Sequence, residues 1–226
     1  MQLRLGAKIL DLAHPRVMGV LNRTPDSFSD GGRFAGFDAA FAQVERMVAE
    51  GADIIDVGGE STRPGSAGVS LQEELERVLP LIESIHARFE TPISIDTSKP
   101  EVMQAAVAAG CAMINDVYAL RRDGALEQAA ACGVTLCLMH MQGEPRTMQK
   151  NPHYEDVTAA VQGFLAGRAQ AAVNAGVPRD RIVLDPGFGF GKNLEHNLTL
   201  LRRLPELAAL GFPLLVGLSR KSMIGT

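Results

Sequence analysis

The chain repeats one unit, a helix-like stretch that ends in glycine and is followed closely by an apolar strand. The glycines at these junctions are Gly51, Gly110, Gly133, Gly176 and Gly211. Glycine is favoured just past the end of a helix because it adopts the left-handed backbone conformation that other residues resist. The strands, such as residues 134–139, are continuous apolar runs, which is typical of parallel strands covered on both faces. Regular alternation of strand and helix leaves two architectures, an open doubly wound sheet or a (β/α)8 barrel.

The sequence after the first strand favours the barrel. A doubly wound nucleotide-binding sheet is expected to carry Gly-x-Gly-x-x-Gly there, whereas residues 22–32 read Asn-Arg-Thr-Pro-Asp-Ser-Phe-Ser-Asp-Gly-Gly. We therefore predict a single α/β domain, residues 1–226, that folds as a (β/α)8 TIM barrel. The repeat supplies seven strands and stops within the seventh helix, so the barrel is predicted to lack its C-terminal eighth unit. Residues 3–12 are predicted to form a hairpin at the barrel floor.

Several helix starts can be placed from capping patterns. Ser70 to Glu73 and Ser98 to Glu101 both fit the capping box, in which the N-cap side chain and the third helical residue bind each other's backbone donors. Further candidate N-caps are Asp38, Asp123 and Asn193.

Composition excludes several classes of function. The net charge is −4, the isoelectric point is near 5.8 and no cluster of Lys and Arg stands out, which argues against nucleic acids or anionic membranes as partners. Apolar runs are no longer than a strand, and the N-terminus lacks the layout of a signal peptide. The cysteines include no Cys-x-x-Cys pair and lie in apolar surroundings, which is typical of reduced thiols. We therefore expect a cytoplasmic enzyme that acts on small molecules.

Polar residues follow the predicted strands at the points where they end. These residues are Asn22, Asp56, Asp96, Asn115, His140, Asp185 and Lys221. One such residue is most simply a helix cap, but a series that converges on one face is better explained as a site, because barrel enzymes place their chemistry there. Asp96, Asn115 and Asp185 suit a flat heterocycle with a guanidine-like edge, since a carboxylate accepts two parallel N–H bonds from such a group. Lys221 and Arg63 supply positive charge for an anionic part of the substrate.

Two other features have simpler explanations. Residues 187–192 read Gly-Phe-Gly-Phe-Gly-Lys, and this spacing fits neither the Walker pattern nor the dinucleotide fingerprint. His140 has no partner at metal-ligand spacing, so a hydrogen-bonded structural histidine is the favoured interpretation.

A series of motifs, in order along the chain, resembles those of the dihydropteroate synthase family. They are residues 22–32, 56–65, 96–100, 114–116, 138–143, 185–192 and 217–222. The similarity runs from about Val17 to the last residue. It implies a pterin-binding barrel, a transferase of folate biosynthesis that condenses 6-hydroxymethyl-7,8-dihydropterin diphosphate with p-aminobenzoate. It also implies a dissociative substitution, Mg²⁺ as cofactor, a homodimer and inhibition by sulfonamides.

The resemblance also implies roles for individual residues. The pterin contacts would be Asp96, Asn115, Asp185 and Lys221, with Val20, Met139, Phe190 and Gly217 as pocket walls. The p-aminobenzoate subsite would comprise Phe28, Thr62, Arg63, Pro64 and Ser222. Asn22 would contact the diphosphate and Mg²⁺. The catalytic residues would be Asp30, Asp96 and Lys221, with Asp30 stabilising a cationic pterin intermediate.

Two departures from the family pattern affect these expectations. Arg23 stands where many relatives carry an apolar residue, in a loop where little effect is expected. No segment matches the family's eighth strand, which carries an Arg-x-His-Asp run for the diphosphate, so we expect slow turnover or none from this 226-residue form.

Two alternatives stay open. One is another pterin-binding barrel, such as a methyltetrahydrofolate methyltransferase, and the other is a non-catalytic pterin-binding remnant.

Overall fold

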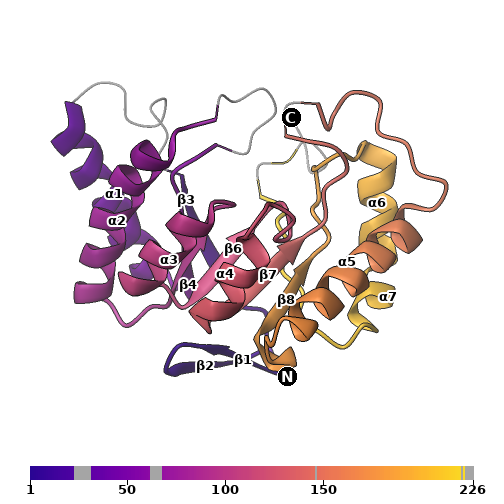
Figure 1. Ribbon diagram of the computed structural model, residues 1–226, viewed down its shortest axis with the longest axis horizontal. Coiled ribbons are helices and arrows are strands. Elements are labelled where there is room, and N and C mark those ends of the chain that lie inside the picture. The colour runs from indigo at the N-terminus through magenta and orange to yellow at the C-terminus, as the bar shows by residue number, and fades with distance from the viewer. Residues whose placement is uncertain (23–31, 62–67, 146, 220, 222–226) are drawn as a thin grey trace.

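A parallel sheet with helices between its strands makes up most of the computed structural model, which describes residues 1–22, 32–61, 68–145, 147–219 and 221. The six strands pair in sequence order: β3 (Met18–Asn22), β4 (Ile54–Gly58), β5 (Ile93–Asp96), β6 (Met113–Asp116), β7 (Thr135–Met139) and β8 (Ile182–Asp185). The helices are α1 (Gly32–Ala49), α2 (Leu71–Arg88), α3 (Pro100–Ala108), α4 (Ala125–Cys132), α5 (Val157–Asn174), η2 (Arg179–Arg181), α6 (Leu194–Arg202) and α7 (Leu204–Ala208) (Figure 1). None of the described helices is long and apolar enough to cross a membrane.

Side chains of the strands alternate between two apolar layers. Ile55, Ile114 and Leu138 belong to the large core that also includes the helix residues. Their neighbours on the other face belong to a smaller core: Ile54, Met113, Cys137 and Val183. Because successive side chains of a strand point to opposite faces, the residues two positions after these also face inward, at the carboxyl end of the sheet.

The predicted N-terminal hairpin is confirmed. β1 (Gln2–Leu5) pairs antiparallel with β2 (Lys8–Asp11). Leu3, Leu5 and Leu10 are buried in the same small core as the inward residues of the sheet. Figure 1 shows the hairpin beneath the sheet, away from the carboxyl ends of the strands. The hairpin therefore covers the floor of the barrel and leaves the other end for a site.

The seventh predicted strand is present only in part. Leu214 forms a single parallel bridge with Leu184 of β8, with backbone hydrogen bonds of 2.9 Å from Leu184 N to Pro213 O and from Leu215 N to Leu184 O. Within the described residues, this segment pairs on the β8 side alone. The pairing is a single bridge and not a continuous ladder. The α/β class and the repeated unit are confirmed, and the described sheet runs from β3 to Leu214 without a pairing between these two ends.

The junction glycines behave as predicted, and the helix starts do so in part. All five junction glycines have a positive φ, between 66° and 119°. Ser70 and Asn193 are N-caps with complete capping boxes.

The capping prediction at Ser98 is wrong. The N-cap of α3 is Lys99, because Pro100 at the first helical position begins the helix one residue later. The other two N-cap predictions are also wrong. Asp123 precedes Gly124, which is the N-cap of α4 in a left-handed conformation, and Asp38 lies inside α1.

Candidate active site

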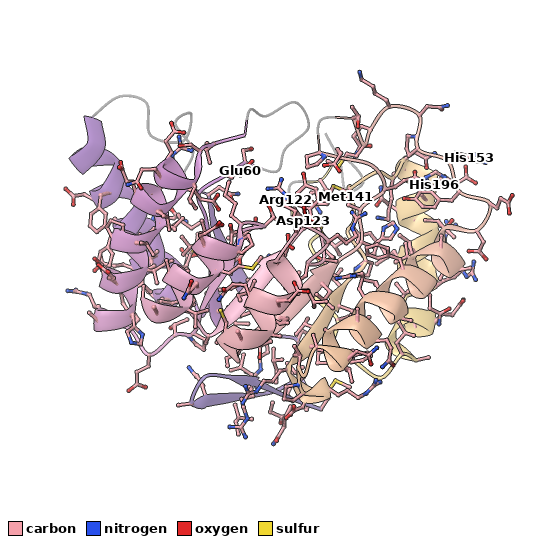
Figure 2. The ribbon with its side chains drawn as sticks, in the orientation of Figure 1. Glu60, Arg122, Asp123, Met141, His153 and His196 are labelled. Carbon is pink, nitrogen blue, oxygen red and sulfur yellow. The ribbon has the colours of Figure 1, made fainter. Side chains whose placement is uncertain are left out.

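Inward-facing side chains at the carboxyl ends of β4–β8 form a mainly polar group. We call this group the rim; its members are Asp56, Asp96, Asn115, Met139 and Asp185. Strand register brings them together, since Asp96 is the partner of Asn115. Met139 is likewise the partner of Asp185 on the neighbouring strand. Figure 2 shows the labelled side chains of Glu60 and Met141 at this same end of the sheet. The alternation of the strands thus places the rim two residues above the small core.

Asp56 lies beside Asn115 across the interior of the sheet. Asn115 Nδ2 donates a hydrogen bond of 3.3 Å to Asp56 Oδ2. Asp56 is 3% exposed, and among the described residues its Oδ1 has no hydrogen-bond partner. Burial raises the pKa of Asp56, and the nearby Ser94 hydroxyl and Asn115 amide oppose this effect. The contact engages one N–H of the Asn115 amide and leaves its oxygen available as an acceptor.

Asp96 is surrounded by other carboxyl groups. Burial raises the pKa of Asp96 well above its ordinary value, and the charges of Asp56 and Asp116 raise it further. No ion pair of Asp96 with Lys or Arg occurs within the described ranges. Cys137, beneath the rim, has its pKa raised by burial and then by the charge of Asp185 and of Asp56. A ligand that donates hydrogen bonds or carries positive charge would therefore be favoured here.

Asp185 has one carboxylate oxygen engaged by the backbone. Gly187 N donates a hydrogen bond of 2.7 Å to Asp185 Oδ1. Burial raises the pKa of Asp185, and the charges of Lys221 and Lys192 oppose this rise. Lys221 donates a hydrogen bond to Phe188 O, and its Nζ lies 4.8 Å from the centroid of the Phe190 ring. Burial lowers the pKa of Lys221, and the nearby charge of Asp185 opposes this.

An apolar cluster adjoins the polar part of the rim. Met139 is 3% exposed and packs with Val117, Met141 and Met148, while Phe190 is partly buried against this cluster. A flat ring bound to the polar side chains would therefore have thioether and aromatic surfaces beside it. Such surfaces are typical of ligand pockets, where a few polar groups orient the ligand within apolar walls.

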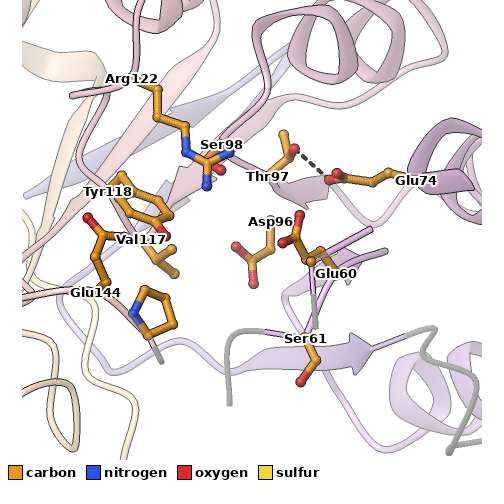
Figure 3. Close-up of a pocket in the computed structure, with 12 residues that line it drawn as sticks. Glu60, Ser61, Glu74, Asp96, Thr97, Ser98, Val117, Tyr118, Arg122 and Glu144 are labelled. Atoms are coloured by element: carbon orange, nitrogen blue, oxygen red, sulfur yellow. Dashed lines mark hydrogen bonds between the residues drawn. The ribbon is translucent and has the colours of Figure 1, made fainter. Parts of the chain in front are cut away.

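A cavity of about 300 Å³ lies on the Asp96 side of the rim. Its lining residues include Glu60, Thr97, Tyr118 and Arg122. Figure 3 shows Asp96 and Glu60 close together in this cavity, with a hydrogen bond of 2.6 Å from Thr97 Oγ1 to Glu74 Oε1. Asn115 and Asp185 do not line it, so the cavity flanks the rim.

The other predicted site residues that the structure describes lie around the rim. Asn22 ends β3, and its Oδ1 would be 2.8 Å from a Cβ added at Gly58, which would also lie 3.6 Å from Asp96 Cβ. Asn22 is therefore a neighbour of Asp96. Val20 is 54% exposed and is the register partner of Asp56. A Cβ added at Gly217 would be 3.5 Å from Lys221 Nζ, so Gly217 lies next to that ammonium group.

Several predicted site residues lie outside the described residues. They are Phe28, Asp30, Thr62, Arg63, Pro64 and Ser222. The structure therefore brings together the predicted pterin residues, and the predicted p-aminobenzoate subsite stays a prediction.

His140 is buried in the manner predicted for a structural histidine. Its Nδ1 lies 3.0 Å from Lys192 Nζ, and its ring packs edge-on against Phe164, with centroids 5.0 Å apart. Burial and the charge of Lys192 lower the pKa of His140 to about 3. The residue is therefore neutral over the usual pH range, and its Nδ1 is an acceptor for Lys192.

The sequence placed Asp56 among the strand-end polar residues without a specific role, and it indicated no role for Lys192; the structure places both residues at or beside the site. Asp56 could have been assigned, because it stands two residues after the inward Ile54 on an apolar strand. Lys192 carried no such signal, since its contacts depend on how the glycine-rich segment folds back.

Comparison with known proteins identifies the family. Residues 18–226 match the model of the family described as "Pterin binding enzyme". The dihydropteroate synthase of Escherichia coli strain K12 is 55% identical over 216 residues, covering 96% of this chain and 77% of that protein.

Solved structures agree. The Yersinia pestis dihydropteroate synthase in complex with a sulfonamide drug has a TM-score of 0.94 and 50% identity, covering 99% of this chain and 82% of that chain. The Xanthomonas albilineans dihydropteroate synthase with 4-aminobenzoic acid has a TM-score of 0.92 and 53% identity, covering 99% of this chain and 80% of that chain. A second structure of the Xanthomonas enzyme is a complex with 7,8-dihydropteroate, at 50% identity and a TM-score of 0.89, covering 99% and 80% of the two chains. With its rim of strand-end acceptors and these similarities over nearly its whole length, the chain belongs to the dihydropteroate synthase family of pterin-binding enzymes.

Proposed function

We propose that this chain condenses 6-hydroxymethyl-7,8-dihydropterin diphosphate with p-aminobenzoate, giving 7,8-dihydropteroate and diphosphate. The observation that carries the proposal is the rim, where Asp96, Asn115 and Asp185 present acceptors at the ends of β5, β6 and β8. The pterin ring has an amino group and a ring N–H side by side, which match a carboxylate that accepts two parallel hydrogen bonds. Family membership supports the same reaction, which is a transferase step of folate biosynthesis.

Each described residue then has a role in holding the pterin. Asp185 accepts from the donor edge through the oxygen that Gly187 N leaves free. Asp96 and Asn115 bind the donors on the other side of the ring. Lys221 donates toward the ring oxygen or nitrogen acceptors. Met139, Phe190, Val20 and Gly217 form the walls around the ring.

The chemistry that follows is a dissociative substitution. The bond between the pterin methylene carbon and the diphosphate oxygen breaks, and its electron pair leaves with the diphosphate. The resulting cation is delocalised into the pterin ring, where the carboxylates of the rim stabilise it without reorganisation. The amine nitrogen of p-aminobenzoate donates its lone pair to the methylene carbon and then loses a proton. The reaction requires no protein nucleophile.

The remaining predicted residues complete the proposal. Asp30 stabilises the cationic intermediate, and Asp96 and Lys221 are the other catalytic residues. Phe28, Thr62, Arg63, Pro64 and Ser222 receive p-aminobenzoate, and sulfonamides compete for this subsite. The support for these roles is the match of the residues to the family's motifs.

The donor set around Asn22 fits a Mg²⁺ ion that is shared with the substrate. Asn22 offers one exposed amide oxygen at the end of β3, and no cluster of three His, Cys, Asp or Glu residues occurs in the part of the chain that the structure describes. Mg²⁺ commonly takes one or two protein oxygens and completes its shell with water and phosphate oxygens. When bound, the ion would neutralise charge on the leaving diphosphate. Asn22 would hold the diphosphate end of the substrate next to Asp96.

We also propose the setting in which the chain acts. Residues 1–226 form a single pterin-binding domain, which works as a homodimer in the cytoplasm. The apolar surroundings of the three cysteines support a reducing compartment, since two of them are buried and all are free.

A single-turnover assay tests the function. The chain is held in excess over the pterin diphosphate, so that slow turnover is still detected, and dihydropteroate and diphosphate are measured together. We expect both products in equal amounts, and Asp185→Asn is expected to abolish them. Glu127→Gln, which changes an exposed carboxylate on α4, should leave them unchanged. Pterin binding without product would instead support the non-catalytic remnant, and transfer of a methyl group from methyltetrahydrofolate would support the methyltransferase.

A further inference from the structure

Lys192 is a buried lysine whose ammonium group contacts backbone carbonyls rather than a carboxylate. The residue is 3% exposed. Its Nζ donates hydrogen bonds of 2.8 Å to Gly187 O and 3.0 Å to Phe190 O, and lies 3.0 Å from His140 Nδ1. His140 O is a more distant acceptor at 3.4 Å. Burial lowers the pKa of Lys192 to about 7. In its protonated form the amino group has three donors, which match these three close acceptors.

Two of the three close acceptors of Lys192, the carbonyls of Gly187 and Phe190, belong to one tight segment, residues 186–191, between β8 and α6. Three glycines in it have positive φ: Gly187, Gly189 and Gly191. A Cβ added at Gly187 would be 1.9 Å from His140 O, so the segment runs against the backbone that follows β7. Phe190 N donates 3.0 Å to Gly187 O, which closes a turn. The carbonyls of Gly187 and Phe190 thereby both lie within hydrogen-bond distance of Lys192 Nζ.

The same segment touches three groups of the proposed pterin site. Gly187 N binds the Asp185 carboxylate at 2.7 Å. Phe188 O accepts a hydrogen bond from Lys221. The ring of Phe190 lies 4.8 Å from Lys221 Nζ and joins the apolar cluster of Met139. The position of the segment therefore sets the positions of a carboxylate, an ammonium group and an aromatic wall.

The outer side of the segment is held separately. Gly189 N donates 2.9 Å to Asn197 Oδ1, and Tyr154 OH donates 2.9 Å to Gly191 O. These contacts do not reach Gly187 O or Phe190 O. Lys192 alone among the described side chains binds these two carbonyls from the inner side. Without it, both would be buried with fewer partners, and the turn that carries Phe190 would lose its inner anchor.

The geometry points to Lys192 as a positioning residue for pterin binding, which gathers the carbonyls of residues 187 and 190 and so holds Asp185, Phe190 and Lys221 in their binding arrangement. This inference rests on the proposed function, because it assigns Lys192 to the pterin half of that site. Lys192 is buried and its close contacts are with the protein, so we assign it an effect through these groups and no contact with the substrate. A side chain that merely filled space would be apolar here, since a buried ammonium group is retained only where several acceptors compensate its loss of water.

The test compares Lys192→Met with two controls. Lys192→Met keeps the length of the side chain and removes its donors. Lys150→Met makes the same exchange at an exposed position, and Leu207→Ala opens a cavity in the core at α7, which Figure 1 shows at the opposite end of the sheet from the rim. Leu207→Ala therefore lowers stability without altering the segment. The measurements are the Kd of 6-hydroxymethylpterin by isothermal titration, the Tm, and hydrogen exchange of peptides that cover residues 186–192.

We expect Lys192→Met to weaken pterin binding at least tenfold and to speed hydrogen exchange in residues 186–192. Leu207→Ala should lower the Tm as much or more and leave the pterin Kd within twofold of the wild-type value. If Lys192→Met does not fold, Lys192→Gln, which keeps two N–H donors, is measured instead. We expect it to lose less pterin affinity and also to show faster hydrogen exchange in residues 186–192 than the wild type. Wild-type affinity in the folded variant, or an equal loss in Leu207→Ala, would overturn the inference.

Asp185→Asn separates this inference from the proposed function. If Asp185→Asn loses pterin binding while Lys192→Met keeps it, the inference alone fails. If the wild-type chain binds no pterin, both the proposed function and the inference about Lys192 fail.

Discussion

Asn115 donates its amide hydrogen to the carboxylate of Asp56, over 3.3 Å from Nδ2 to Oδ2. One of the two N–H donors of the Asn115 amide is thereby engaged, and its oxygen remains available as an acceptor. Asp56 is thus an orienting group for a residue that we propose to bind the pterin. Its own second oxygen has no partner among the described residues, so the pair is incompletely satisfied without a ligand or water.

This relationship predicts the effect of changing Asp56. Asp56→Leu removes the acceptor and frees the Asn115 amide to rotate, so pterin binding should weaken about tenfold, or about 1.4 kcal/mol. Asp56→Asn can still accept through its amide oxygen, and a smaller loss is expected. Isothermal titration with 6-hydroxymethylpterin measures both. The exposed Asp180→Leu is the control, and an unchanged Kd in Asp56→Leu would remove the orienting role.

Asp96 predicts a conflict between stability and binding. Its pKa is raised by burial and by neighbouring carboxylates, so the folded state holds the proton more tightly than the unfolded state does. The free energy of unfolding therefore falls as the pH rises from 3.8 through the raised pKa, because the carboxyl group loses its proton in the folded state at a higher pH than in the unfolded state. Asp96→Asn, which cannot ionise, should raise the free energy of unfolding at pH 8 and abolish pterin binding.

Urea unfolding at pH 5 and pH 8 checks this prediction. The difference between wild type and Asp96→Asn should be smaller at pH 5 than at pH 8, because the raised pKa favours the protonated carboxyl group at the lower pH. A variant that is less stable than the wild type at pH 8 would show that the carboxylate has a stabilising partner.

Gly187 predicts a large loss of stability on a small substitution. Its φ is +67°, and the Cβ of an alanine would lie 1.9 Å from His140 O, so Gly187→Ala forces the backbone to move. We expect the free energy of unfolding to drop by about 2–4 kcal/mol. The matched control is Gly163→Ala inside α5, where nothing lies within 4 Å of the added Cβ. That control should stabilise the chain by about 0.5–1 kcal/mol, because glycine is a poor helix former. Similar unfolding curves for the two variants would contradict the packing described for residues 186–191.

Arg168 supports a strained turn that follows Asn115. Ala119 and Leu120 have positive φ values of 52° and 58°, which are unfavourable for residues with a Cβ. Arg168 of α5 donates 2.8 Å to Ala119 O and 3.0 Å to Leu120 O. Arg168→Met should therefore lower the free energy of unfolding by about 1–3 kcal/mol, since it leaves two carbonyls without their donors. Thermal unfolding measures this loss. Arg202→Met, at an exposed position on α6, is the control and should have little effect on the free energy of unfolding.

Much of the architecture follows from local rules in the sequence. The glycine junctions, the hairpin and the caps at Ser70 and Asn193 were predictable, because each depends on a few neighbouring residues. The start of α3 was missed because Pro100 favours the first helical position and so competes with the Ser98 capping box. The apolar side chains around Leu214 predict a full strand. A strand also needs partners on its edges, and no local pattern indicates whether these are present.

The candidate site likewise has residues that the sequence could predict and contacts that it could not. Asp96, Asn115 and Asp185 were predictable because parallel strands bring their carboxyl ends to one face. The contact between Asp56 and Asn115 depends on register across three neighbouring strands, β4 to β6. The carbonyl contacts of Lys192 depend on the fold of a segment with left-handed glycines at three alternate positions. Such contacts arise from tertiary packing, so residue spacing alone did not indicate them.

Isothermal titration of 6-hydroxymethylpterin into the wild-type chain and into Asp185→Asn tests the central claim most directly. The claim is that the strand-end acceptors of the rim bind the donor edge of a pterin. We predict one site per chain in the wild type and at least a hundredfold weaker binding in Asp185→Asn, with Glu127→Gln equal to the wild type. Absence of binding to the wild type, or equal affinity in Asp185→Asn, would contradict the account.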